Sequence, residues 1–329
     1  MRARITGSAS AARIPLAAGG GSLGRSVFLS RSARIAWAGF RAVLVVGICF
    51  IIVYPVLIQL SMAFMDSADL YDLSVHWIPR HFTLRNFGIA IAQLSYAKAF
   101  FNSLSIATAQ ALLQVVSSTV IGYGLARFRF RGARLVFALV VFTLLVPPSL
   151  VSVPLFLNFR FFTLFGLLKP PGFNLIGSPL PLFLLSLTGT AKRNGLFIYM
   201  TRQYFRTMPT TIEEAAYVDG AGTVKTFARF MLPNAIPVLV IVFLFSFVWQ
   251  WNDIFYSDFF LKGRAILSLN FQALTDKFAY SWSSPFIEGS HIRLVSNAGI
   301  LLYIAPVLVL YAFLQRFFVE SITRTGIVG

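Results

Sequence analysis

The sequence has 329 residues, of which 57% are hydrophobic and 12% are charged, and its mean hydropathy is +0.76. A soluble domain of this length cannot bury that much apolar surface, so the composition excludes a soluble globular protein and predicts that the bilayer is part of its solvent. The net charge of +17 would favour nucleic-acid binding in a soluble protein, but in a membrane protein the placement of the charges decides what they mean.

The N-terminal segment, 1–35, is rich in Arg, Ser, Ala and Gly and contains no acidic residue. This composition imitates an organellar transit peptide, and it fits equally well a disordered cytoplasmic tail attracted to anionic lipid. The tail is the favoured interpretation, and residues 36–329 are expected to form one transmembrane domain. A cleaved signal peptide is not expected, because the first apolar run is too long for one.

Six apolar stretches follow, each long enough for a helix to cross about 30 Å of hydrocarbon. Helices are expected because unpaired backbone in lipid is costly and no alternating barrel pattern is present. The predicted fold is therefore all-α and integral to the membrane, with six transmembrane helices. Their approximate bounds are 42–64, 101–126, 135–157, 180–204, 234–256 and 297–318.

The second stretch carries small residues at four-residue spacing, which predicts close packing against another helix. Pro147 and Pro148 are expected to bend the third stretch. The small residues are Ser103, Ala107 and Ala111, followed by Ser118, Gly122 and Ala126.

Polar residues inside the spans are candidates for a solute pathway, because placing them in lipid is costly. Lys192 and Arg193 lie near the middle of the fourth span, and two explanations are open. The span is broken there and "TGTAKRNG" lines a watery cavity, or the two cations face an anionic solute. A structural role of the pair is the favoured interpretation. An aromatic ring beside hydrogen-bonding groups suits a sugar, but interfacial anchoring is the favoured interpretation of the fifth-span cluster. The candidates are Asn102, Gln114, Lys192, Arg193, Trp249, Trp251, Asn252 and Asp253.

Lys and Arg predict the orientation. If the N-terminus is cytoplasmic, the inner segments hold 17 basic and four acidic residues. The outer segments then hold nine basic and seven acidic residues. The resulting net charges of +13 and +2 place both termini in the cytoplasm. The basic charge is then explained by topology and by membrane lipid, and no nucleic-acid partner is expected.

Residues 209–233 form a polar loop between the fourth and fifth spans, on the predicted cytoplasmic side. Thr211 and Glu214 are expected to form a capping box on a short helix, which Gly220 and Gly222 end. A second helix is predicted before Leu232-Pro233 turns the chain back into the membrane. The residues alone leave two functions open, an interfacial hairpin that packs against the bundle or a docking element for a cytoplasmic partner. The predicted apolar face of the second helix is Val224, Phe227, Ala228 and Met231.

The last outer segment, 257–296, is long and is predicted to be an extracytoplasmic loop that contacts an external partner. The histidines stand at no metal-ligand spacing, so neither a metal site nor a cofactor is expected. Asp66, Asp69 and Asp72 are the one acidic group that a membrane enzyme could use, and no nucleophile or metal-binding residue accompanies them.

The polar loop resembles the EAA loop of the membrane subunits of ATP-binding-cassette importers. The family pattern is Glu-Ala-Ala, three residues, Gly, nine residues, an apolar residue, any residue, and Leu-Pro. Glu214-Ala215-Ala216, Gly220, Phe230 and Leu232-Pro233 keep every interval. "FNSLSIATAQ", "GYGLARFRFRGAR" and "FVWQWNDIF" further resemble the carbohydrate-uptake subfamily, which includes the maltose and glycerol-3-phosphate systems. The resemblance covers about 41–329.

This resemblance implies a type I ABC importer permease fold, multi-pass in the bacterial inner membrane. Two homologous permease subunits would form the pathway for a sugar or sugar-like solute, two ATPase subunits would dock beneath them, and an extracytoplasmic solute-binding protein would deliver the solute. No GxxxxGK[ST] loop is present, so the chain is not expected to be an enzyme. A non-sugar solute, a membrane enzyme and a channel are the alternatives. The implied ATPase-coupling residues are Glu213, Glu214, Ala215, Ala216, Asp219, Gly220, Leu232 and Pro233.

Overall fold

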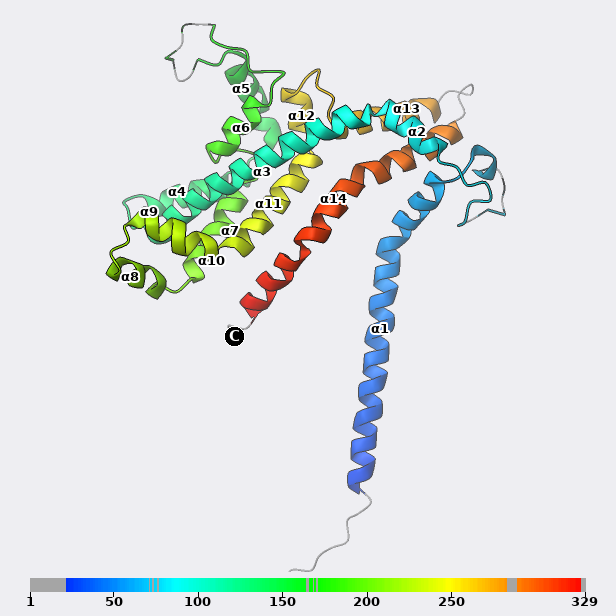
Figure 1. Ribbon diagram of the computed structural model, residues 1–329, viewed down its shortest axis with the longest axis horizontal. Coiled ribbons are helices and arrows are strands. Elements are labelled where there is room, and N and C mark those ends of the chain that lie inside the picture. Colours follow the sequence, from blue (N-terminus) through cyan, green and yellow to red (C-terminus); the bar gives the residue numbers. More distant parts are fainter. Residues whose placement is uncertain are drawn as a thin grey trace, which may run out of the picture. The chain divides into compact units, whose positions relative to one another are not determined.

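The computed structural model describes residues 22–70, 72, 74–75, 77–163, 166–167, 169, 171–282 and 289–326 (Figure 1). Within these residues the chain is helical, and two isolated bridges are the only strand-like pairings. The all-α prediction is confirmed. The helices are α1 (Ser22–Ala63), α2 (Arg85–Gln93), α3 (Tyr96–Arg127), α4 (Ala133–Phe142), α5 (Pro148–Arg160), α6 (Leu180–Leu187), α7 (Asn194–Thr207), α8 (Thr211–Val218), α9 (Thr223–Thr226), α10 (Leu232–Asn234), α11 (Ile236–Trp251), α12 (Phe255–Phe260), α13 (Leu267–Trp282) and α14 (Gly289–Gly326), with a 3-10 helix, η1 (Ser67–Leu70), and a π-helical turn, η2 (Phe227–Met231).

Residues up to Ile58 form one compact unit, and residues from Gln59 onward form a second. The described part of the first unit is 22–58, all within α1, and apolar side chains there, such as Val43 and Ile51, are exposed. Exposed apolar side chains on a helix of this length are typical of a lipid-facing span. Because α1 begins at Ser22, the expected tail is wrong for residues 22–35, which are helical; residues 1–21 lie outside the described residues.

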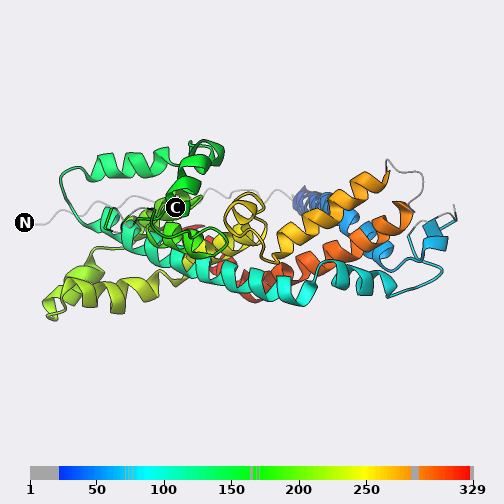
Figure 2. The same cartoon turned by 90° about the horizontal axis from the view of Figure 1, so that it is seen from above.

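The second unit is organised around α3, along which α6, α7, α11 and α13 pack (Figures 1 and 2). The predicted small-residue face of α3 is confirmed, since Ala107, Ser118 and Gly122 on it are buried and Ala126 is half-buried. Small side chains let the neighbouring helices approach closely. α8, α9 and α10 gather at the C-terminal end of α3, and α2 and α13 lie at its other end (Figure 1).

Gly122 is the tightest point of this packing. A Cβ atom there would overlap Thr201 Oγ1 and would lie 2.9 Å from the backbone N of Arg202 in α7. Gly122→Ala is therefore expected to lower the free energy of unfolding by about 1–3 kcal/mol, measured as a lower melting temperature of the detergent-purified protein. Gly124→Ala is the matched control, because its nearest neighbour is Phe128 at 3.9 Å and alanine favours the helix. Equal melting temperatures would contradict close α3–α7 packing.

Three helical segments are long and apolar enough to cross a membrane alone: Arg34–Ala63, Tyr96–Arg127 and His291–Phe317. A fourth candidate combines Thr223–Asn234 with Ile236–Trp251, which meet at a bend of 74°. The last long helix, α14, begins well before the expected sixth span.

The expected third and fourth spans, 135–157 and 180–204, are each broken. α4 ends at Phe142 and α5 begins at Pro148. The break falls before the two prolines because proline lacks an N–H group and disfavours a helical conformation in the residue before it. α6 and α7 separate at 188–193, where Gly189 and Arg193 have φ angles of +76° and +65°. Of the two explanations for Lys192 and Arg193, the broken span is therefore the arrangement observed.

The expected outer segment 257–296 is largely helical. Apart from residues 283–288, which lie outside the described residues, most of this segment belongs to α12, α13 and the first turns of α14. The segment is too polar for a span but long enough to form amphipathic helices, and its contact with an external partner stays a prediction.

The polar loop 209–233 forms a hairpin of α8 followed by α9, η2 and α10. The capping box is wrong: the N–H of Glu214 donates to the carbonyl of Thr210, and Thr210, which precedes the helix, makes no side-chain capping bond. Gly220 ends α8 as predicted, with a φ angle of +77°. A positive φ stops the helix at little cost when no Cβ is present.

The second half of the hairpin differs further from expectation. Val224 and Ala228, placed on the predicted apolar face, are exposed, whereas Met231 is buried. Leu232 and Pro233 lie inside α10, and the chain bends one residue after that helix ends. The π-helical turn changes the helical period, which explains why the 3.6-residue pattern failed here.

Candidate functional site

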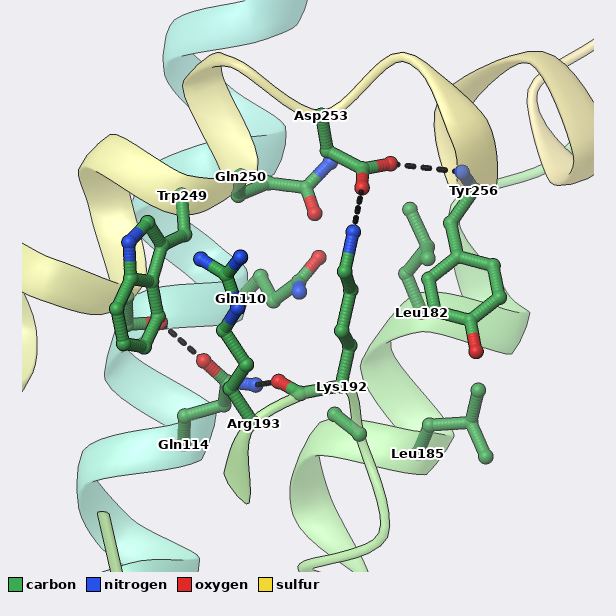
Figure 3. A pocket seen from close by; sticks show the side chains of 12 residues that line it. Gln110, Gln114, Leu182, Leu185, Lys192, Arg193, Trp249, Gln250, Asp253 and Tyr256 are labelled. Atoms are coloured by element: carbon green, nitrogen blue, oxygen red, sulfur yellow. Dashed lines mark hydrogen bonds and ion pairs between the residues drawn. The ribbon is translucent and has the colours of Figure 1, made fainter. Parts of the chain in front are cut away.

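A polar cavity lies where the break between α6 and α7 faces α3 and the end of α11 (Figure 3). Its volume is about 30 Å³, whereas pockets for small solutes measure about 300–1,000 Å³. In this conformation the cavity has room for water only. The polar lining is Gln110, Gln114, Lys192, Arg193, Ser246, Trp249, Gln250 and Asp253.

Lys192 and Asp253 form the ionic centre of this cavity. Lys192 Nζ lies 3.0 Å from Asp253 Oδ1, and Asp253 Oδ2 accepts a hydrogen bond from the N–H of Tyr256 at 2.8 Å (Figure 3). The same oxygen accepts a second bond from the N–H of Ser257 at 2.9 Å. The Asp253 side chain is 4% exposed, so its charge depends on these partners. One carboxylate thus joins the α6–α7 break to the start of α12.

Arg193 stands beside the ion pair, with its guanidinium carbon 4.2 Å from the centre of the Trp249 ring. This is a cation–π contact, and Trp249 in turn stacks on Phe197 and Phe245. The left-handed backbone of Arg193 costs about 1–3 kcal/mol in a non-glycine residue. Within the described part of the chain, Arg193 has no carboxylate partner.

Two glutamines one turn apart on α3 face the cavity and are bonded differently (Figure 3). Gln114 Oε1 accepts a short hydrogen bond from Ser246, and its Nε2 donates to the carbonyl of Lys192 at 3.5 Å. Gln110 is also buried, but its Oε1 has no hydrogen-bond partner among the described residues. An unbonded buried oxygen costs about 1–3 kcal/mol, so Gln110 is an acceptor open to a hydroxyl group or water in the cavity.

The structure brings some of the sequence-predicted pathway residues together and separates the others. The candidates that meet in the cavity are Gln114, Lys192, Arg193, Trp249 and Asp253. The other three make structural hydrogen bonds elsewhere. Asn102 donates to the carbonyl of Ala265, Trp251 donates to the carbonyl of Tyr303, and Asn252 accepts a bond from the Tyr303 hydroxyl.

Gln110, Ser246 and Gln250 line the cavity and were missed in the sequence. Gln110 could have been found, because it stands four residues before Gln114 on the same helix face as the buried small residues. Ser246 and Gln250 are single polar residues in an apolar run, and their four-residue spacing is the corresponding signal.

A second polar cluster anchors α8 to the end of α3. Glu213 Oε1 accepts a hydrogen bond from the Tyr123 hydroxyl at 2.8 Å, and Oε2 lies 3.1 Å from Arg127 Nε. The Nε–H is not aligned with that oxygen, so the contact is an ion pair without a hydrogen bond. Arg127 also donates to the carbonyl of Met208 at 2.8 Å. The two charged side chains are only 10% and 11% exposed.

The opposite face of α8 is open. Glu214, Ala215 and Asp219 are exposed, and Val218 is 87% exposed, while Ala216 is buried beside Glu213. A short helix that is anchored on one side and presents acidic and apolar groups on the other has the features of a protein-docking surface. The hairpin residues singled out in the sequence therefore divide into a buried set, which faces α3, and an exposed set.

Two helices connect the polar cavity with the hairpin. Lys192 and Arg193 immediately precede α7, and Met208 immediately follows it. α11 begins just after the hairpin and ends two residues before Asp253. With 14 and 16 residues, these helices span about 21 and 24 Å. Each end of the hairpin is thereby joined by a helix to one side of the Lys192–Asp253 ion pair.

The acidic group near η1 serves the local structure. Asp69 is buried and accepts a hydrogen bond from the backbone N–H of His81 at 2.9 Å, and its other oxygen lies 2.7 Å from His81 Nδ1. Burial raises the pKa of Asp69, but the hydrogen bonds from His81 lower it more, so that its pKa lies below the usual value. Asp72 forms an ion pair with Arg80. Asp66 accepts hydrogen bonds from the Ser67 hydroxyl and the N–H of Ala68, so all three acids are engaged in holding this segment together.

The chain is similar to known membrane transport proteins. Residues 118–324 match the family described as "Binding-protein-dependent transport system inner membrane component". The chain is 29% identical to a diacetylchitobiose uptake system permease protein of Streptomyces coelicolor over 83% of each chain. It is 30% identical to an osmoprotective compounds uptake permease protein of Synechocystis over 76% of this chain and 77% of the relative.

A solved structure shares the fold. It is a chain of a bacterial ABC transporter involved in the import of the acidic polysaccharide alginate. The TM-score is 0.63 at 23% identity, with 88% of this chain and 98% of that chain covered. The fold expected from the polar loop is that of this neighbour.

Proposed function

Because this chain belongs to the family of binding-protein-dependent transport system inner membrane components, we propose that it forms half of the translocation pathway of an ATP-driven importer. A second homologous permease subunit forms the other half, and an extracytoplasmic binding protein delivers the solute. ATP is hydrolysed by two ATPase subunits that dock on α8, so this chain has a mechanical role and no catalytic one.

The proposed topology has six crossings and two cytoplasmic termini. The crossings are α1, α3, the broken pairs α4–α5 and α6–α7, α11, and α14. Two observations support this arrangement: the excess of Lys and Arg in the inner segments, and the position of the hairpin at the same end of α3 as the arginine-rich residues 127–134.

The proposed solute is a carbohydrate or a similar polyhydroxylated compound. The Streptomyces relative is by name an uptake permease for diacetylchitobiose. The cavity offers the aromatic ring of Trp249 together with the amides of Gln110, Gln114 and Gln250, groups that suit a sugar ring and its hydroxyls.

The observation that carries the proposed coupling is the connection of both ends of the hairpin to the cavity. When the ATPase subunits close and displace α8, α7 and α11 transmit the movement to the two sides of the Lys192–Asp253 ion pair. Separation of this pair opens the small cavity to the solute. The strained backbone of Arg193 and the glycine at 189 mark the break as the element with two conformations.

Gln110→Leu is expected to weaken transport without weakening the fold. Oε1 of Gln110 has no hydrogen-bond partner among the described residues, so its loss costs the protein no internal bond there. A bond to a solute hydroxyl contributes about 0.5–1.5 kcal/mol, so the KM for uptake into proteoliposomes should rise about two- to tenfold at an unchanged melting temperature.

Gln114→Leu is the matched control, one helical turn away. It breaks the bonds to Ser246 and to the Lys192 carbonyl, and it should therefore lower the melting temperature. Unchanged uptake by Gln110→Leu would remove Gln110 from the pathway. Failure of the wild-type chain to support ATP-dependent uptake with its partner subunits would contradict the proposed function itself.

A further inference from the structure

A second, basic hollow has a volume of about 790 Å³ and lies where the turn 128–132 meets α4 and α7. No carboxylate lines it, and in the part of the chain that the structure describes none of its arginines is in an ion pair. Like charges around one concave surface repel each other, so the hollow is complementary to an anion. The arginines are Arg129, Arg131, Arg134, Arg202 and Arg206.

Arg202 is held in place before any ligand arrives. Its Nε donates to the carbonyl of Leu125 at 3.3 Å, and its guanidinium carbon lies 3.7 Å from the centre of the Phe137 ring. A fixed guanidinium presents its remaining N–H groups as a planar fork, a geometry that matches the oxygens of a phosphate group.

The surroundings of the hollow are apolar. Phe128 and Phe130 alternate with the arginines of the turn and are about half exposed. α4, which starts at the hollow, exposes Leu135, Leu139 and Phe142, each by more than half. Alternating aromatic and basic side chains next to an exposed apolar helix are typical of the level of lipid headgroups.

We propose that the hollow binds an anionic phospholipid, with the headgroup phosphate among the arginines and the acyl chains along α4. The positive charge of the arginines favours an anionic headgroup. The exposed apolar surface of α4 beside them favours a ligand with acyl chains over a free anion. The site is separate from the exposed face of α8 and does not depend on which solute is carried.

The test uses the assembled transporter, purified in detergent and titrated with phosphatidylglycerol or phosphatidylcholine under native mass spectrometry. The wild type is expected to retain phosphatidylglycerol and not phosphatidylcholine. The Arg131→Gln/Arg134→Gln variant should bind phosphatidylglycerol at least tenfold more weakly. The control Arg85→Gln/Lys98→Gln removes the same charge at exposed positions outside the hollow and should bind like the wild type.

Arg131→Lys/Arg134→Lys keeps the charge and should keep the preference for phosphatidylglycerol, which separates an electrostatic loss from misfolding. Equal phosphatidylglycerol binding by the wild type and the Gln variant would overturn the proposal. The proposal would also be overturned if inorganic phosphate protected the transporter against thermal unfolding as well as the lipid does, because the hollow would then bind a free anion. Loss of the ATPase subunits from the Gln variant at unchanged lipid binding would show a protein contact instead.

Discussion

A Glu213→Ala subunit is expected to lose the order of its hairpin and, with it, transport. The substitution leaves the guanidinium of Arg127 nearly buried without its counter-charge and the Tyr123 hydroxyl without its acceptor. Breaking a buried ion pair from one side costs about 3–5 kcal/mol. Hydrogen exchange should show loss of protection in residues 211–218, and uptake into proteoliposomes should fall to background.

The double variant Arg127→Leu/Glu213→Leu is the decisive comparison. Removing both charges avoids an unpaired one, but the double variant also loses the Tyr123–Glu213 hydrogen bond and the bond from Arg127 to the Met208 carbonyl, so hairpin protection should return in part. Tyr123→Phe removes one hydrogen bond to a charged group and should cost less, about 1.5–3 kcal/mol. A double variant as unprotected as Glu213→Ala would show that the ion pair does not anchor α8.

Glu214→Lys is expected to abolish transport while the melting temperature of the subunit stays unchanged. Glu214 is exposed and lies on the open face of α8, so reversing its charge disturbs no described internal contact. In a complex, reversing a charge that becomes desolvated at an interface costs about 2–5 kcal/mol, which weakens ATPase binding by about 30-fold or more. Co-purification of the ATPase subunits and ATP-dependent uptake measure the effect.

Thr211→Ala is the matched control on the same helix. The N–H of Glu214 bonds to the backbone of Thr210, so the Thr211 side chain is not needed to cap α8 and transport should be retained. If Thr211→Ala abolished transport as Glu214→Lys does, the defect would lie in the folding of α8. Full activity of Glu214→Lys would remove that residue from the docking surface.

Local chemistry predicted much of the fold. Hydropathy predicted the helices, and the spacing of Ser118, Gly122 and Ala126 predicted the packed face of α3. The breaks escaped prediction in part because hydropathy is insensitive to backbone conformation: 180–204 is apolar enough for one helix, yet Gly189 and Arg193 adopt positive φ angles inside it.

The candidate site was only partly predictable, because its pairings are tertiary. Lys192 and Asp253 are 61 residues apart, and Tyr123 and Glu213 are 90 apart. Sequence position alone does not distinguish Glu213 from Glu214. The two are neighbours on one helix turn, but rotation by about 100° per residue buries the first and exposes the second. The motif lies on α8, and the packing of α8 against α3 decides which carboxylate faces inward.

The central claim, that α8 docks on the ATPase in the cytoplasm, is tested most directly by photo-cross-linking. A benzoylphenylalanine placed at Val218, which is 87% exposed, should cross-link to the ATPase subunit of the assembled transporter on illumination. The same group at Ile78, 81% exposed and in a predicted outer segment, should not. Cross-links from position 218 to lipid alone, or to the ATPase from position 78, would contradict the account.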